Sequence, residues 1–263
     1  YLDEYTRITT GGGAIDITGT GGGATYDNYG IYTYYATLDT SKNDGTTGGL
    51  VTLKGTGGTG SGGYNYGVYL NNNTCITTGG EVIDIKGYDG GGTGDYNYGI
   101  RTYDAILDTR TLNGTIGGGV NLDGTGGSGI GYNYGVHLDS YTRIATGGGA
   151  LYVKGTGGGD GTGDYNYGIH TYDADLDTRN GATGGSVTLD GTGGLGTNSN
   201  VGVYLDYTTV TTGGGLLDVT GTGGHIDGHD ILAQKLVDHP NDGVDRHGLA
   251  AGDVDHFSVR LFR

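Results

Sequence analysis

The stretch Gly94-Asp95-Tyr96-Asn97-Tyr98-Gly99-Ile100 (GDYNYGI) returns unchanged at residues 163–169, and the variants YDNYGI and GYNYGV recur along the chain. Aligning the units on the Ile or Val that follows this motif gives six positions: Ile31, Val68, Ile100, Val136, Ile169 and Val203. The intervals between them are 37, 32, 36, 33 and 34 residues, so one unit is about 34 residues long. Alternate units match better than neighbours do, which indicates a two-unit super-repeat of roughly 68 residues.

Within each unit, apolar residues alternate with polar ones at period two, as at Ile15 and Ile17 or at Val51 and Leu53. This alternation is typical of strands, and glycine clusters such as Gly-Thr-Gly-Gly separate three short strands per unit. Because three short strands cannot bury their own apolar face, the units must stack on one another. The sequence therefore predicts an all-β fold, a right-handed parallel β-helix of about seven coils, over residues 1–224. A non-repeat tail follows over residues 225–263.

Stacking the coils in register places equivalent residues of the motif above one another. An amide side chain carries both donors and an acceptor, so a column of asparagines can bond from coil to coil and brace the corner. The predicted structural ladder is Asn28, Asn65, Asn97, Asn133, Asn166 and Asn200. The tyrosine after each asparagine, replaced by Val201 in the last unit, forms a second column, and the next glycine forms a third.

The net charge of the chain is −16, which argues against nucleic acid and against anionic membrane surfaces as partners. No apolar run is long enough to cross a bilayer, so we expect no membrane insertion in this segment. The single cysteine, Cys75, excludes an internal disulfide. The chain contains no methionine and starts inside a repeat unit, from which we expect a processed or truncated piece of a longer protein.

The succession of Gly-Thr-Gly-Gly, Tyr-Asn-Tyr-Gly-Val and Thr-x-Ile-x-Thr-Gly-Gly-Gly over residues 1–224 resembles the repeat regions of large secreted bacterial adhesins, the filamentous-haemagglutinin-like and autotransporter proteins. This resemblance implies an extracellular or cell-surface β-helix used for attachment, biofilm or fibre building. We therefore expect a structural, non-catalytic role as a stalk or filament-forming segment, with copies of the chain joined end to end as partners. The alternative is a carbohydrate-binding or polysaccharide-cleaving β-helix.

The residue after each aligned Ile or Val is expected to point away from the core. Its column is aromatic and cationic, and such a row could stack against surface glycans or a partner protein. The column comprises Tyr1, Tyr32, Tyr69, Arg101, His137, His170 and Tyr204. The plainer interpretation is that tyrosine suits strands and stacks on itself.

Acidic residues recur with the repeat, as at Asp39, Asp108 and Asp177, whereas a catalytic site normally breaks the periodicity of its scaffold. The sequence therefore predicts no enzyme and no cofactor. Two glycine loops, residues 88–95 and 157–164, hold several acids and suggest Ca²⁺ as an alternative ligand. Their spacing differs from that of calcium-binding solenoids, so solvated acidic loops are the expectation.

Three hypotheses apply to the tail. It could cap the solenoid, with residues 230–239 (DILAQKLVDH) as a short amphipathic helix over the open end. Alternatively, residues 257–262 (FSVRLF) could pair with the free edge of a neighbouring chain and propagate a fibre. A metal site is the third hypothesis, and its candidate ligands are His225, Asp227, His229 and Asp230.

Overall fold

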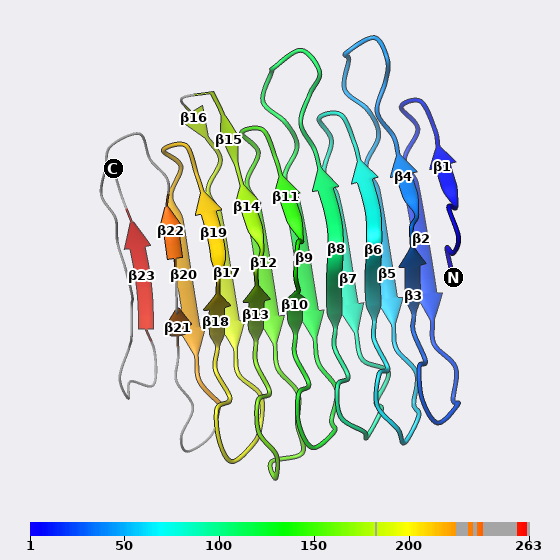
Figure 1. Cartoon of the computed structure of the whole chain (residues 1–263), viewed down its shortest axis with the longest axis vertical. Helices are drawn as coiled ribbons and strands as arrows, with labels where there is room; N and C mark the ends of the chain where they lie inside the picture. The colour runs from blue at the N-terminus through cyan, green and yellow to red at the C-terminus, as the bar shows by residue number, and fades with distance from the viewer. Residues whose placement is uncertain (182, 225–230, 234–235, 239–256, 262–263) are drawn as a thin grey trace.

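The computed structural model describes residues 1–181, 183–224, 231–233, 236–238 and 257–261, which form strands and loops without any helix (Figure 1). The chain winds alternately through two large sheets. The eight-stranded sheet, here called sheet B, contributes one strand per coil. Its seven parallel strands are β2 (Ile15–Thr20), β5 (Val51–Thr56), β7 (Ile83–Tyr88), β9 (Val120–Thr125), β12 (Leu151–Thr156), β17 (Val187–Thr192) and β20 (Leu217–Thr222).

The thirteen-stranded sheet, here called sheet A, carries two strand segments per coil, which merge into one bent strand in β6 and β8. The first segments are β3 (Ile31–Tyr34), β6 (Val68–Thr77), β8 (Ile100–Asp108), β10 (Val136–Leu138), β13 (Ile169–Tyr172) and β18 (Val203–Asp206). The second segments, apart from those in β6 and β8, are β1 (Arg7–Thr9), β4 (Thr37–Asp39), β11 (Arg143–Ala145), β14 (Asp175–Asp177) and β19 (Thr208–Thr211). Together these strands confirm the predicted parallel β-helix.

The core lies between the two sheets and is built from the alternating apolar residues. Equivalent residues pair across neighbouring coils, as Ile15 does with Val51 and Val51 with Ile83. Each strand of sheet B from β5 to β20 then buries its first and third side chains, and Val51 and Leu53 have no exposed surface. This register matters because a slip of one residue would turn every apolar side chain to solvent.

The two sheets meet along two edges that differ in construction (Figure 1). Along the edge drawn at the bottom, here called the corner edge, the chain passes from sheet B through the Tyr-Asn-Tyr-Gly motif into sheet A. Along the opposite edge, here called the loop edge, it returns from sheet A to sheet B. The connections there alternate between long loops at residues 40–50, 109–119 and 178–186 and short turns at 10–14, 78–82, 146–150 and 212–216. The third long loop contains a small hairpin of β15 (Arg179–Asn180) and β16 (Thr183–Gly184).

The long loops contact one another across the short turns that separate them. Asn113 Nδ2 donates to the carbonyl oxygen of Gly45, two coils away, at 3.0 Å, and Asn180 Nδ2 donates to that of Gly114 at 3.1 Å. The short turn between the first two long loops lies against both, since a Cβ on Gly80 would fall 2.8 Å from Thr111 Cγ2 and 3.5 Å from Thr47 Cγ2. These contacts account for the two-unit super-repeat.

The expected helix in the tail is wrong. Residues 231–233 and 236–238 form strands β21 (Ile231–Ala233) and β22 (Leu236–Asp238), which pair in parallel with β18 and β19 and extend sheet A. The free edge of sheet A offers unpaired backbone groups, and extended chain satisfies them where a helix could not. Strand β23 (Phe257–Leu261) lies antiparallel on β20 of the same chain, which covers the last parallel strand of sheet B in the manner of a cap.

Candidate functional site

The corner edge turns at the residue before each ladder asparagine, which adopts a left-handed conformation in every coil. The φ angles are 61° at Asp27, 66° at Tyr64, 60° at Tyr96, 56° at Tyr132, 59° at Tyr165 and 51° at Ser199. This conformation costs a non-glycine residue about 1–2 kcal/mol. It persists because the residues that follow are held by the asparagine ladder and the stacked rings.

The asparagine ladder is confirmed as the brace of this corner. Asn65 Nδ2 and the Asn65 backbone nitrogen both donate to Asn97 Oδ1 at 3.0 Å, and the Asn97 backbone nitrogen donates to Asn133 Oδ1 at 3.1 Å. Asn65 Nδ2 also donates to the carbonyl oxygen of Gly62 at 2.6 Å, which ties the preceding glycine loop to the ladder. Five of the six ladder asparagines have no exposed surface, and Asn28 keeps 5%.

The second tyrosine of the motif forms a buried stack, here called the inner ladder, which consists of Tyr29, Tyr66, Tyr98, Tyr134 and Tyr167. Neighbouring rings lie 4.8–5.3 Å apart between centroids, and the Tyr66 and Tyr98 planes differ by 3°. Burial raises the pKa of Tyr66 and Tyr98 well above the ordinary range, so these phenols stay neutral. Val201 ends the ladder, as the sequence predicts.

The glycine that closes the motif is required by close backbone approach. A Cβ on Gly67 would lie 2.3 Å from the backbone nitrogen of Tyr88, and a Cβ on Gly55 in β5 would lie 2.0 Å from the carbonyl oxygen of Gly67. No side chain fits between the two sheets at this point. The glycine of Tyr-Asn-Tyr-Gly and the glycine of Gly-Thr-Gly-Gly therefore form one seam along the corner edge.

The column predicted to face solvent, here called the sheet-A column, points away from the core but is largely covered. Each ring of the inner ladder folds back over it, and Tyr66 meets Tyr69 edge-on with 5.3 Å between ring centroids. His137 keeps only 8% of its surface exposed, and Tyr32, Tyr69, Arg101, His170 and Tyr204 are half-buried. The column thus points outward as predicted, but apart from Tyr1, which is 76% exposed, it is only partly exposed, because rings from the neighbouring corner lie over it.

Arg101 occupies a position of the sheet-A column where the other coils have an aromatic residue, and its guanidinium group contacts neighbouring tyrosine rings. Its guanidinium carbon lies 5.1 Å from the ring centroid of Tyr69 and 5.9 Å from that of Tyr98. Arg101 Nη2 also donates to Asp139 Oδ2 at 2.7 Å, and both side chains are mostly buried. The arginine charge is therefore balanced within the protein, and little of it is available to attract an anion.

His137 and His170 form a stacked pair next to Arg101 in the same column. Their centroids lie 4.7 Å apart with 9° between the planes. Burial lowers the pKa of His170 to about 4 and holds the pKa of His137 well below its usual range, so both imidazoles are neutral near pH 7. Neither nitrogen of His137, nor Nδ1 of His170, has a hydrogen-bond partner among the described residues. The pair behaves as two more rings in the stack.

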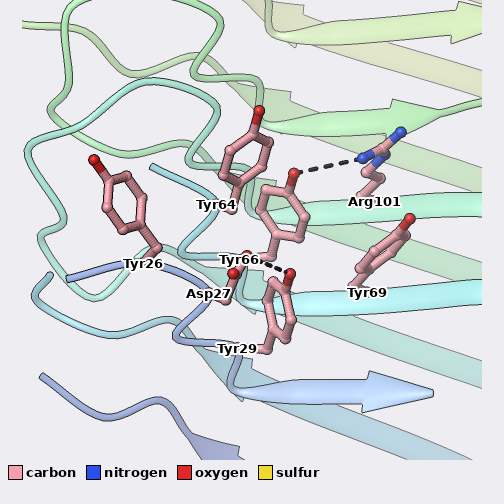
Figure 2. Close-up of a pocket in the computed structure, with 7 residues that line it drawn as sticks. All are labelled: Tyr26, Asp27, Tyr29, Tyr64, Tyr66, Tyr69 and Arg101. Atoms are coloured by element: carbon pink, nitrogen blue, oxygen red, sulfur yellow. Dashed lines mark hydrogen bonds between the residues drawn. The ribbon is translucent and has the colours of Figure 1, made fainter. Parts of the chain in front are cut away.

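A pocket of about 450 Å³ opens at the corner edge of the first three coils (Figure 2). It is lined by Tyr26, Asp27, Tyr29, Tyr64, Tyr66, Tyr69 and Arg101. Tyr26 and Tyr64 are exposed, whereas Tyr66 is buried and lies deeper. Figure 2 shows Asp27 between the two loop tyrosines and the inner ladder, where Tyr29 Oη donates to Asp27 Oδ1 at 2.8 Å. The sequence prediction named Tyr69 and Arg101 but missed the other five.

The recurring acids at the loop edge hold the chain in its turns. Asp108 accepts four hydrogen bonds from Arg110, one of them from its backbone nitrogen, and Asp177 pairs with Arg179 at 2.7 Å. Asp39 accepts from the backbone nitrogen of Ser41 at 3.0 Å. Each carboxylate thus accepts from a residue two positions further along the chain.

The two acidic glycine loops are also tied down by protein donors. Asp160 Oδ1 accepts from Thr162 in its own loop, and Asp164 Oδ1 accepts from Thr197 and Asn198 in the next coil. Asp89 Oδ2 accepts from the Gly91 backbone nitrogen at 2.6 Å. Across the residues that the structure describes, no three His, Cys, Asp or Glu side chains gather as a metal set. The candidate ligands His225, Asp227, His229 and Asp230 lie outside that part of the chain.

Comparison of the chain with protein-family models, with curated proteins and with solved structures gave no match. A search of the described residues for a helix long and apolar enough to cross a membrane found none.

Proposed function

We propose that this chain is a structural segment, a stalk or filament-forming part, of an extracellular surface adhesin or fibre of bacterial type. One observation supports this proposal above all. At the corner edge, the asparagine and tyrosine side chains contact the equivalent side chains of the next coil. The asparagine ladder and the inner ladder each run through five or six coils, with ladder amides bonded and rings stacked from one coil to the next. Such side chains build a rigid scaffold and leave few groups free for chemistry.

Further support comes from the charge and from the acids. A net charge of −16 keeps a large repetitive surface solvated and discourages random association between copies. The repeated carboxylates Asp39, Asp108 and Asp177 each accept from a residue two positions further along the chain and so hold the loops in their turns. The repeat style shared with secreted bacterial adhesins agrees with this role and supplies the proposed location.

End-to-end association with further copies belongs to the same proposal. Seven coils at about 4.8 Å per strand stack to roughly 35 Å, and the longest axis of the molecule runs along the strands instead (Figure 1). A stalk or fibre therefore needs more coils than this chain supplies, either within one longer protein or by stacking of copies. In this chain β23 covers the edge of β20, so stacking at that end requires β23 to leave.

Negative-stain electron microscopy of the full chain and of the Val259→Pro variant tests the proposal. Val259 pairs with Val219, and a proline there removes a backbone donor from the middle of the covering strand. We expect single particles from the full chain and fibres of uniform width from the variant, with or without calcium. Absence of fibres in both would contradict the filament role. Release of reducing or unsaturated sugars from a polysaccharide panel would contradict the non-catalytic role.

A further inference from the structure

The pocket at the corner edge exists because one aromatic column is interrupted. The first tyrosine of the motif forms an outer column, in which Tyr64 stacks on Tyr96 at 5.4 Å, Tyr96 on Tyr132 at 4.8 Å and Tyr132 on Tyr165 at 5.0 Å between centroids. In the first coil the equivalent residue is Asp27. The position that a fifth ring would occupy beside Tyr64 is therefore left open.

The walls of this opening combine flat apolar faces with polar groups. Tyr64 is 42% exposed and Tyr26, from the preceding coil, is 59% exposed. Tyr26 is held in place by the next coil, since a Cβ on Gly62 would lie 2.3 Å from Tyr26 Cδ1. Asp27 lies between the two loop tyrosines and the inner ladder (Figure 2). A pyranose ring has the matching character, because its C–H face packs on aromatic rings and its hydroxyl rim donates to a carboxylate.

The charge of the opening favours a neutral sugar over an acidic one. Arg101 is the one cation in the lining, and it is already paired with Asp139 at 2.7 Å and covered by Tyr69. The Asp27 carboxylate adds a further negative charge, and the whole chain carries −16. A carboxylate or sulfate on the ligand would therefore be repelled more than attracted.

The size of the opening agrees with a short stretch of saccharide. Its volume of about 450 Å³ lies within the usual range of roughly 300–1,000 Å³ for small-molecule sites. We propose that this pocket, formed by Tyr26, Asp27, Tyr64 and the inner-ladder rings Tyr29 and Tyr66, binds a neutral hexopyranose unit in place of the missing ring. The site takes Tyr69 and Arg101 from the sheet-A column only as part of its lining, and the proposal depends on the fold and not on the structural role proposed above.

Titration of the full chain with cellohexaose and maltohexaose, by isothermal calorimetry and saturation-transfer NMR, tests the proposal. We expect at least one of them to bind with a Kd of about 1 mM or tighter, and trigalacturonate to bind at least about tenfold more weakly. A peptide of alternating glycine and tyrosine serves as the probe for an aromatic protein partner. Stronger binding of that peptide than of either hexasaccharide would overturn the assignment to sugar.

Two variants locate the binding within the opening. Tyr64→Ala removes one stacking face and is expected to raise the Kd about tenfold. Asp27→Tyr completes the outer column with the residue that other coils use at the same φ, so it is expected to fold normally and to abolish binding. Tyr165→Ala is the matched control, because Tyr165 is a similarly exposed ring at the other end of the outer column and does not line the pocket.

Besides stronger binding of the peptide, three results would overturn the proposal. The first is no binding of either neutral hexasaccharide to the full chain. The second is unchanged binding by the folded Asp27→Tyr variant, with circular dichroism confirming its β structure. The third is an equal loss of binding in Tyr64→Ala and Tyr165→Ala, which would indicate contact with the whole outer column and not with the opening.

Discussion

The corner edge and the loop edge of this solenoid carry the same coils but repeat with different periods. The corner edge repeats with every coil, because its asparagines, glycines and most of its tyrosines contact their equivalents one coil away. The loop edge is the same only in every second coil, because a long loop reaches over a short turn to the next long loop. The difference teaches that the repeat of about 34 residues and the repeat of about 68 have separate physical origins.

Burial separates the two edges as well. The corner bonds lie among side chains with almost no exposed surface, whereas both Asn113 and Asn180 donate across exposed loop tips. A buried amide that loses its partner costs free energy, while an exposed one bonds to water instead. We therefore expect the corner edge to determine stability and the loop edge to contribute little.

The largest expected effect comes from Asn97→Ala in the middle of the ladder. The change removes the acceptor of the buried Asn65 backbone nitrogen and of one Asn65 Nδ2 bond, and it removes the donor to the carbonyl oxygens of Gly92 and Gly94. At about 1–3 kcal/mol for each unsatisfied group, the free energy of unfolding should fall by on the order of 4 kcal/mol. Urea unfolding followed by circular dichroism measures it. Asn113→Ala is the matched loop-edge control, and a loss there above about 1 kcal/mol would break the comparison.

A somewhat smaller loss is expected from Gly67→Ala in the glycine seam. The new methyl would meet the Tyr88 backbone nitrogen at 2.3 Å, and backbone on both sides cannot move aside cheaply. We expect a loss of about 3 kcal/mol. Gly114→Ala at the loop edge has open space around its Cβ but a φ of 73°, so about 1 kcal/mol is expected there. Equal losses in the two variants would show that φ and not close approach makes the seam glycine necessary.

Acid should weaken the corner edge through its buried histidines. In the unfolded chain an imidazole binds its proton below about pH 6.5, but in the folded chain His170 does so only near pH 4. The unfolded state therefore binds more protons between these values, and stability falls as the pH drops through that window. We expect the urea midpoint to decrease from pH 7 to pH 4.5, and to decrease less in His170→Tyr, which restores the residue type found at Tyr204.

Asp89 acts in the opposite direction within the same pH window. Burial raises the pKa of its carboxyl to about 6, so the folded state holds that proton more tightly and gains stability as the pH falls below 6. The Asp89→Asn variant should therefore lose more stability on acidification than the unchanged chain. The histidine effect is the difference between the chain and His170→Tyr at each pH, and a difference that does not change with pH would contradict it.

The smallest effect is expected from shortening a long loop. Replacing residues 109–119 with the short turn 78–82 removes the bond from Asn113 to Gly45 and the acceptor at Gly114, but it leaves both sheets and the corner intact. We expect a change in the free energy of unfolding within about 1 kcal/mol, since a shorter loop also costs less closure entropy. A loss comparable with that of Asn97→Ala would show that the loop edge carries stability after all.

The sequence predicted the corner well and the environment of its columns poorly. Period-two alternation and the repeated asparagine predict the register of strands in adjacent coils, because both depend on contacts between equivalent positions. The alternation does not predict exposure. Tyr69 and His137 lie on the outer side of their strands, as predicted, but the rings of Tyr66, Tyr98 and Tyr134 cover them. No local pattern predicts a side chain that returns from the adjacent corner.

The pocket was missed for a related reason. Its decisive feature is Asp27 at a position that carries tyrosine in the next four coils, which the alignment of repeats displays. The consequence follows only when those tyrosines are known to stack on one another along an outer column. In the tail, the periodicity of residues 230–239 suggested a helix, but pairing with the free edges of β18 and β19 favoured strands.

The bridging of long loops over short turns also constrains how such a protein can change in length over evolution. Duplication or deletion of a single coil would preserve the asparagine ladder but would place two long loops, or two short turns, directly beside each other. Duplication of a pair of coils would preserve the Asn113 to Gly45 type of contact as well as the ladder. A gain or loss of coils in pairs would therefore keep the contacts of both edges. We expect homologous proteins to differ in length by multiples of about 68 residues, because such changes need no compensating substitutions.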